Sequence, residues 1–173
     1  MLYWLLVIVG SIGLDQLTKW LAVTYLKGGG SFPLWEGVLH FTYVENTGAA
    51  FGSFKDQRWV FMIVSSIAIV ALVGYYFYFK PKDRLTTTAL AFITGGGIGN
   101  MIDRVLMGYV VDFIDFTLID FAVFNVADSF VCVGVGLMFL ALILSERREA
   151  QAKKLAAETA EPADDGEETT HDD

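Results

Sequence analysis

The sequence predicts an all-α membrane protein with four transmembrane helices and a small extracytoplasmic β-sheet formed by the first outer loop. Hydrophobic residues make up 54% of the 173 residues and charged residues only 18%, and the mean hydropathy is +0.51. A helix of about 20 apolar residues crosses a hydrocarbon core of about 30 Å. Four apolar runs of this length are present, at residues 2–26, 59–79, 85–106 and 124–144.

The first run is apolar except for Asp15, Gln16 and Lys19. A cleaved signal peptide is the competing interpretation of such an N-terminal run. Signal peptides have a basic region before the apolar run and a small-x-small cleavage site after it, and neither feature is present here. We therefore expect an uncleaved first transmembrane helix.

The segment 27–58, which follows the first run, contains a strand signal. Leu39, Phe41 and Tyr43 alternate with the residues between them, as in a strand with one buried face. We expect a small sheet on the outer face of the membrane. Because the apolar face of this sheet has little else to bury against, we also expect the segment to lie over the functional site.

The other three runs differ in character. The run 59–79 has no charged residue and ends in an aromatic cluster, which suits a membrane interface. The run 85–106 is rich in glycine and ends in polar residues, whereas the run 124–144 is closed by Ser145, Glu146 and a pair of arginines. Each run is expected to form one transmembrane helix.

The distribution of basic residues predicts the orientation in the membrane. Basic residues flank the connection 80–84 and the end of the last run, whereas 105–123 contains three aspartates and no Lys or Arg. The positive-inside rule therefore places both termini in the cytoplasm, and 27–58 and 105–123 outside. Three basic residues in 27–58 oppose this assignment, so it depends mainly on the other flanks.

The chain divides into a four-helix transmembrane domain, residues 1–148, and an acidic cytoplasmic tail, residues 149–173. Residues 146–173 hold ten acidic and four basic side chains, which supply −6 of the net charge of −8. The last helix can continue through Lys154, but the composition beyond Pro162 predicts disorder. The acidic balance gives no support for nucleic-acid binding, which needs a basic patch.

Asp15 and Lys19 are four residues apart, so they share one face of the first helix. Intramembrane ionisable groups usually pair with one another, which favours an ion pair that neutralises itself. The alternative is that one of the two side chains reaches a bound ligand. The sequence leaves both interpretations open.

Asn46 and Gly48 stand in a short stretch of turn-forming residues. Asn also offers two donors and one acceptor beside small residues, which would let a substrate backbone approach. A turn and a binding site are therefore equally supported here.

The glycine-rich stretch 95–99 is followed by Asn100, Asp103 and Arg104. Glycines in a membrane helix allow close helix approach. A phosphate-binding loop is excluded, because the stretch lacks the Lys-Ser/Thr ending and follows a helical run rather than a strand. These three polar residues lie within about one turn of each other, so they could form a hydrogen-bonded group in which Asp103 and Arg104 offset each other's charge.

Asp112 and Asp128 are carboxylates in strongly apolar surroundings. Ionised groups are costly there and mark functional sites, so these two are the candidate catalytic pair. Asn125 stands three residues before Asp128, the spacing of a helix capping box, which would fix the direction of Asp128. We expect Asp115 and Asp120 to be solvated loop residues.

No metal or other cofactor is predicted. Zinc ligands are His, Cys and carboxylate side chains at close spacing, and the candidates His40, Cys132 and His171 are scattered along the chain. Serine catalysis lacks a plausible base for the same reason.

Five motifs together resemble those of lipoprotein signal peptidase, also called signal peptidase II. They occur in the expected order and with the expected four spans over residues 1–145. The motifs are Asp15 with Lys19, Asn46 to Phe51, Gly99 and Asn100 with Asp103 and Arg104, Val111 to Phe113, and Phe124 and Asn125 with Ala127 and Asp128.

The resemblance implies an intramembrane aspartyl endopeptidase of the bacterial cytoplasmic membrane, with its active site near the outer face. Its expected substrates are prolipoproteins whose cysteine carries an S-diacylglyceryl group, and it is expected to cut just before that cysteine. By residue matching, Asp112 and Asp128 are the catalytic pair. The residues matched to substrate binding or to support of the pair are Asn46, Gly48, Asn100, Arg104, Asn125, Asp15 and Lys19.

Two other functions compete with this prediction. A small transporter or channel subunit could use the membrane carboxylates as a proton or cation path, although no internal repeat is visible. A membrane scaffold without chemistry would tolerate the loss of either candidate aspartate. The expected partners are prolipoproteins and membrane lipid, and we expect the protein to work as a monomer.

Overall fold

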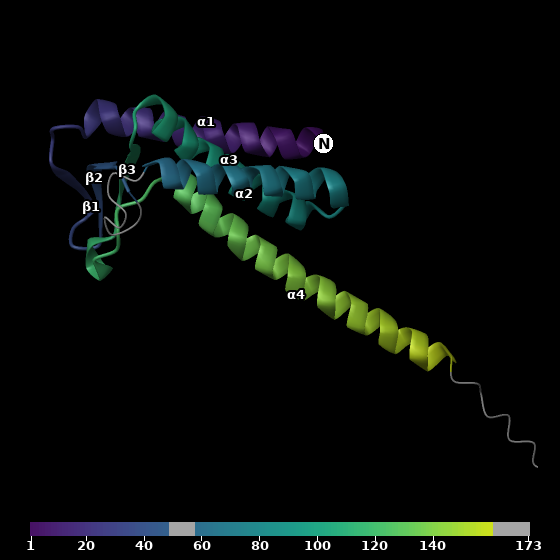
Figure 1. Cartoon of the computed structure of the whole chain (residues 1–173). Coiled ribbons are helices and arrows are strands. Elements are labelled where there is room, and N and C mark those ends of the chain that lie inside the picture. Colours follow the sequence, from purple (N-terminus) through teal and green to yellow (C-terminus); the bar gives the residue numbers. More distant parts are fainter. Residues whose placement is uncertain (49–57, 161–173) are drawn as a thin grey trace, which may run out of the picture. The chain divides into compact units, whose positions relative to one another are not determined.

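The computed structural model describes residues 1–48 and 58–160. Residues 1–138 form one compact unit, which contains every element discussed below except the later part of the last helix. The elements, shown in Figure 1, are α1 (Leu2–Tyr25), β1 (Ser31–Trp35), β2 (Leu39–Asn46), α2 (Arg58–Phe79), α3 (Arg84–Leu106), β3 (Val110–Asp115), the 3-10 helix η2 (Thr117–Ile119) and α4 (Val126–Ala160).

A helix forms at each of the four predicted runs, but the helices are not equally apolar. Within the described residues, α1, α2 and α4 are long and apolar enough to cross a membrane. The helix α3 has 23 residues and does not reach that standard, because it carries threonines, glycines and charged residues. It is also the helix that packs against both α1 and α2, so it needs fewer side chains suited to lipid. A fourth membrane crossing by α3 remains a prediction.

Small residues let α3 approach its neighbours closely, as the glycine-rich stretch predicted. A Cβ atom on Gly96 would overlap the carbonyl oxygen of Ala127 in α4, and one on Gly99 would lie 2.5 Å from an oxygen of Asp15 in α1. At the other end of the bundle, the rings of Trp4 and Tyr76 stack with centroids 4.1 Å apart. The backbone of α3 therefore lies directly against α1 and α4 near Asp15, with no room for a side chain at Gly96 or Gly99.

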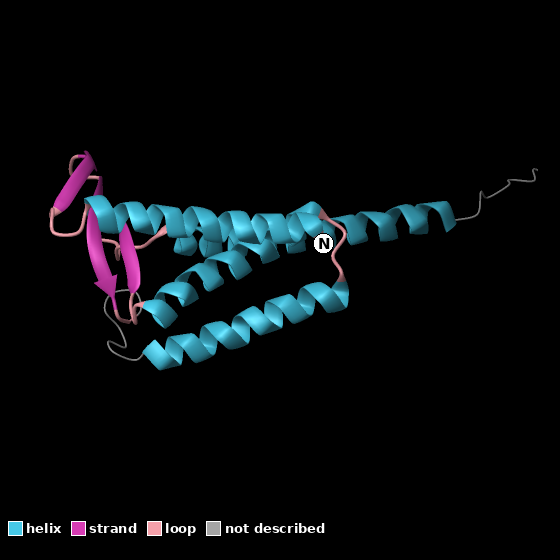
Figure 2. Ribbon diagram, turned by 90° about the horizontal axis from the view of Figure 1, so that it is seen from above, coloured by secondary structure: helices cyan, strands magenta, loops and turns pink. Residues whose placement is uncertain are grey.

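The sheet has three antiparallel strands in the order β1-β2-β3 and lies at one end of the helices (Figure 2). The predicted strand around Leu39 to Tyr43 is present as β2. The first outer loop supplies two of the three strands, as predicted, but the third strand, β3, comes from 105–123, where no strand was predicted. The first four residues of β3 are all buried, so its sequence lacks the alternation that marks a strand with one exposed face.

The apolar face of this sheet packs on α1. The rings of Phe41 and Phe113 lie 6.3 Å apart, and Phe113 belongs to a buried cluster with Ala22 of α1. The expectation that 27–58 lies over the functional site rests on the premise that its apolar face has little else to bury against. That premise is wrong, because the apolar side chains bury against the end of α1. The polar end of β2, Asn46, is what reaches toward Asp112.

The helix α4 is longer than the predicted span and continues to Ala160. This agrees with the expected continuation through Lys154 and makes residues 149–160, which we assigned to the tail, helical. The rest of the tail, 161–173, and the residues 49–57 lie outside the described part. The predicted disorder of the tail and the predicted role of Ala49 to Phe51 therefore stay predictions.

Candidate active site

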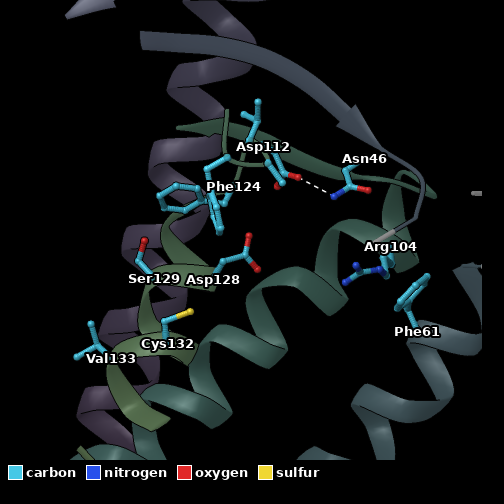
Figure 3. Close-up of a pocket in the computed structure, with 12 residues that line it drawn as sticks. Asn46, Phe61, Arg104, Asp112, Phe124, Asp128, Ser129, Cys132 and Val133 are labelled. Carbon is cyan, nitrogen blue, oxygen red and sulfur yellow. Dashed lines mark hydrogen bonds between the residues drawn. The ribbon is translucent and has the colours of Figure 1, made fainter. Parts of the chain in front are cut away.

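Asp112 and Asp128 line one cavity of about 520 Å³ (Figure 3). Asp112 lies in β3, which the chain reaches after leaving α3, and Asp128 lies in the first turn of α4. Asn46, Arg104, Ser129 and Cys132 also line the cavity, together with the apolar wall residues Phe61, Phe121, Ala122, Val123, Phe124 and Val133. The structure thus brings the two candidate aspartates to one water-accessible space with largely apolar walls.

Asp112 is buried, with 1% of its surface exposed, and both of its carboxylate oxygens accept hydrogen bonds. Asn46 Nδ2 donates to Oδ2 at 2.8 Å, and Asn125 Nδ2 donates to Oδ1 at 2.6 Å. Burial raises the pKa of Asp112 to about 7, the two hydrogen bonds oppose that rise, and the charge of Asp128 adds to it. Asp112 is therefore a carboxyl group that exchanges its proton near neutral pH.

Asp128 takes part in the predicted capping box. Asn125 Oδ1 accepts from the backbone N–H of Asp128 at 2.9 Å, and Asp128 Oδ2 accepts from the backbone N–H of Asn125 at 3.2 Å. These are the two reciprocal bonds of a capping box, so this prediction is confirmed. The other oxygen of Asp128 accepts from Asn100 Nδ2 at 2.7 Å, which fixes the carboxylate from a second helix.

Asn125 connects the two aspartates. Its amide nitrogen donates to Asp112 Oδ1 and to Asn100 Oδ1, the second at 3.0 Å, while its amide oxygen caps α4. The side chain is completely buried. All of its polar groups are used, so its orientation is fixed and it holds β3 against the start of α4.

Asp15 and Lys19 form the predicted ion pair, with Lys19 Nζ 3.0 Å from Asp15 Oδ2. The same ammonium lies 2.9 Å from Asp103 Oδ2 and donates to Asn100 Oδ1 at 2.8 Å. These three contacts use all three N–H donors of Lys19. The interpretation as a structural pair is thus supported, and the pair lies behind Asn100 rather than on the cavity wall.

Asp103 makes its ion pair with Lys19 and not with Arg104, although the charges of Asp103 and Arg104 still attract each other. The guanidinium of Arg104 turns instead toward the cavity, where it lies 5.3 Å from the ring centroid of Phe61. Its Nη1 donates to the carbonyl oxygen of Asn100 at 3.4 Å. Consecutive residues of a helix point in different directions, so Asp103 and Arg104 face different neighbours.

Asn46 combines the two interpretations that the sequence left open. Its Oδ1 accepts from the backbone N–H of Gly48 at 3.0 Å, which is a turn closed by the side chain. Its Nδ2 donates to Asp112. The turn therefore fixes the amide that contacts the candidate catalytic carboxyl group.

Gln16 and Asp103 also belong to this network, and their hydrogen bonds could not be predicted from the sequence. Gln16 Nε2 donates to Asp15 Oδ2 at 3.2 Å, to the carbonyl oxygen of Gly99 at 3.2 Å and to Asp103 Oδ1 at 3.0 Å. Asp103 Oδ2 also accepts from the backbone N–H of Val111 at 3.1 Å. The one available signal was that Gln16 is three residues before Lys19, on nearly the same helix face.

No group of three or more His, Cys, Asp or Glu side chains that could hold a metal ion is found in residues 1–48 and 58–160. His40 lies in β2, where its ring contacts Ser31, and Cys132 lies on the cavity wall one turn beyond Asp128. The polar groups that face the cavity are thus carboxyl, amide, hydroxyl, thiol and guanidinium groups.

Comparison with known proteins finds close similarity over most of the chain. The family model described as signal peptidase (SPase) II matches residues 7–144. A lipoprotein signal peptidase from Halalkalibacterium halodurans is 47% identical over 156 residues, which cover 88% of this chain and 99% of that protein. One from Brevibacillus brevis is 42% identical and covers 79% of this chain and 92% of its own length.

Two solved structures share the fold. Both are described as bacterial membrane enzymes. The first superposes with a TM-score of 0.78 at 35% identity and covers 84% of this chain and 90% of its own. The second has a TM-score of 0.75 at 36% identity and covers 82% and 93%.

Proposed function

This chain belongs to the signal peptidase II family, whose members are proteases, and from that premise we propose that it is an intramembrane aspartyl endopeptidase. Its reaction is the removal of the signal peptide from bacterial prolipoproteins, by a cut just before the diacylglyceryl-modified cysteine. The observation that carries the aspartyl mechanism is that Asp112 and Asp128 line one cavity. The pKa of Asp112 near 7 supports it.

The two carboxyl groups share one proton at neutral pH, because two adjacent carboxylates cannot both ionise cheaply. Asp112, the more buried of the two, holds the proton. Asp128, in the first turn of α4 and partly exposed, is the carboxylate. A water molecule between them has a base on one side and an acid on the other.

Cleavage then proceeds in two steps. Asp128 takes a proton from the water while the water oxygen bonds to the scissile carbonyl carbon, and Asp112 gives its proton to the carbonyl oxygen. In the second step Asp128 gives its proton to the cysteine nitrogen as the C–N bond breaks. One hydroxyl of the intermediate returns a proton to Asp112 as the new carboxyl group forms, which restores the starting state.

The other predicted site residues, on the cavity wall or behind it, have supporting roles in this proposal. Asn46, Asn100 and Asn125 hold the two carboxyl groups through the hydrogen bonds described above. Gly48 closes the turn that orients Asn46, and Asp15 and Lys19 support Asn100 from behind. Arg104, on the cavity wall with Phe61, contacts the substrate backbone.

The proposed location is the bacterial cytoplasmic membrane, with both termini in the cytoplasm and the cavity near the outer face. The apolar helices α1, α2 and α4 support a membrane location. The sheet lies at the end of the helices where α4 begins (Figure 1), and the cavity is lined by Asp112 of the sheet and Asp128 in the first turn of α4. A diacylglyceryl group stays in the lipid, so the adjacent peptide bond is held at the membrane surface, where the cavity is proposed to lie. The partners are thus lipid-modified prolipoproteins and membrane lipid, and the working unit is a monomer.

The purified protein in detergent is expected to cut a prolipoprotein that carries the S-diacylglyceryl cysteine and to leave the same prolipoprotein without the lipid intact. Mass spectrometry of the products should find the new N-terminus at the modified cysteine. Folded protein that leaves the lipid-modified substrate whole, or that cuts both forms equally fast, would contradict the proposed function.

A further inference from the structure

Asp15 and Asp103 lie in different helices but make the same kind of contact. Asp15 Oδ1 accepts from the backbone N–H of Ala127 at 2.9 Å, and Ala127 directly precedes Asp128. Asp103 Oδ2 accepts from the backbone N–H of Val111 at 3.1 Å, and Val111 directly precedes Asp112. Each buried carboxylate thus holds the backbone immediately before one of the two aspartates of the cavity.

Lys19 joins these two carboxylates. Its ammonium lies 3.0 Å from Asp15 and 2.9 Å from Asp103, and the side chains of all three residues are at most 4% exposed. Gln16 donates to the same two carboxylates, which adds hydrogen bonds to a group with more negative than positive charge. Such a buried set holds its geometry only while every member is paired.

The contact from Asp103 to Val111 matters because β3 is an edge strand of the sheet. Within the described residues, no further strand pairs with Val111 on the outer side of β3. Val111 is fully buried, and a buried backbone N–H without an acceptor is costly. The carboxylate of Asp103 supplies that acceptor from α3. It therefore fixes β3 against α3, at the residue next to Asp112.

We propose that Asp103 is a positioning residue for Asp112, and that Asp15, Lys19 and Asp103 together set the spacing of the two aspartates. The proposal rests on the proposed function, because it assigns the three residues to the support of a catalytic pair. None of the three lines the cavity. Each acts through the backbone N–H or through Asn100, so none is a catalytic residue.

Removal of the Asp103 charge should also change the pH dependence. The charged groups that act on Asp112 are Asp128 of α4 and Lys19 of α1, and Arg104 of α3. Asp15 and Asp103 are paired with Lys19, and Glu45 of β2 is paired with Lys27. Lys19 lowers the pKa of Asp112, and its charge is less compensated once Asp103 is neutral. The pKa of Asp112 should therefore fall, and the alkaline limb of the rate profile should move to lower pH.

The test measures kcat, KM and the pH profile of Asp103→Ala and Asp103→Asn with the lipid-modified prolipoprotein. Asp103→Ala is expected to lower kcat at least about tenfold with KM within about twofold, since a misplacement of about 1 Å can cost about 100-fold. Asp103→Asn keeps an oxygen that can accept from Val111, so it should recover part of kcat. Its alkaline limb should remain at lower pH. The matched control is Asp120→Asn, at an exposed turn residue outside the cavity, which should behave like the unmodified protein.

A normal kcat and an unmoved pH profile in Asp103→Asn would overturn the inference. So would a loss explained fully by a smaller folded fraction, with normal kcat and pH profile for each folded molecule. If Asp103→Ala does not fold, the test is the pH of the alkaline limb in the rate profile of Asp103→Asn: a shift to lower pH supports the inference, and an unchanged limb overturns it. Full cleavage by Asp112→Asn would instead show that the proposed function fails, and the inference would fall with it.

Discussion

Replacing Asp112 by Asn is expected to reduce the rate of cleavage of the lipid-modified prolipoprotein by about 100-fold to 10 000-fold, the usual contribution of general acid–base catalysis. Asn has the same shape but cannot give its proton to the carbonyl oxygen of the substrate. Both oxygens of Asp112 accept from amide N–H groups, and the amide nitrogen of Asn cannot accept. The variant therefore loses one hydrogen bond, which costs about 1 kcal/mol, so its cleavage rate is compared per folded molecule. Asp128→Asn should cause a comparable loss, since it removes the base.

The matched control is Asp115→Asn, in the same strand as Asp112. Asp115 accepts from Thr42 Oγ1 at 2.7 Å and does not line the cavity. Its replacement should leave the cleavage rate within about twofold, the scatter expected of a residue outside the reaction. If Asp112→Asn and Asp115→Asn cleave equally well, Asp112 has no part in the chemistry.

Asn125→Ala is the second change with a large expected effect. It removes the hydrogen bonds to Asp112 and Asn100 and the side-chain cap of α4 together. The loss of a cap costs about 1 kcal/mol, and the loss of the buried hydrogen bonds should add about as much again. The cleavage rate should fall about 100-fold, because both carboxyl groups lose their common anchor.

Asn125→Ser separates the cap from the link between the aspartates. Ser is a good N-cap residue, so this variant should recover much of the unfolding temperature in a thermal unfolding experiment. Its short hydroxyl side chain cannot reach both Asp112 and Asn100, so the cleavage rate should stay low. A Ser variant with normal activity would reduce Asn125 to a helix cap.

The helices and the polar residues of the site could be predicted because both leave local signals. A membrane helix needs a long apolar run, and each carboxylate or amide in such a run is conspicuous. The capping box of Asn125 and Asp128 and the pair of Asp15 with Lys19 are also local, since their members are three or four residues apart. The structure places all of these as their spacing indicates.

Contacts between distant segments could not be predicted in the same way. The strand β3 is buried on both faces and forms only by pairing with β2, more than 60 residues earlier, as in the pairing of Val44 with Asp112. The ion pair of Asp103 with Lys19 was not predicted, for a related reason. The sequence neighbour of Asp103, Arg104, points elsewhere on α3, while Lys19 is brought to Asp103 by the packing of α1 against α3. Neither contact has a local pattern.

The pH dependence of kcat/KM tests the central claim, that Asp112 and Asp128 act as a pair that shares one proton, most directly. With the pKa of Asp112 near 7, the shared proton is lost as the pH rises through that value. The rate should then fall about tenfold per pH unit above it. At acidic pH the rate should fall again once the second carboxylate is protonated, which gives a bell whose limbs belong to the coupled pair. A kcat/KM that rises through pH 7 and stays level to pH 9 would contradict the shared proton.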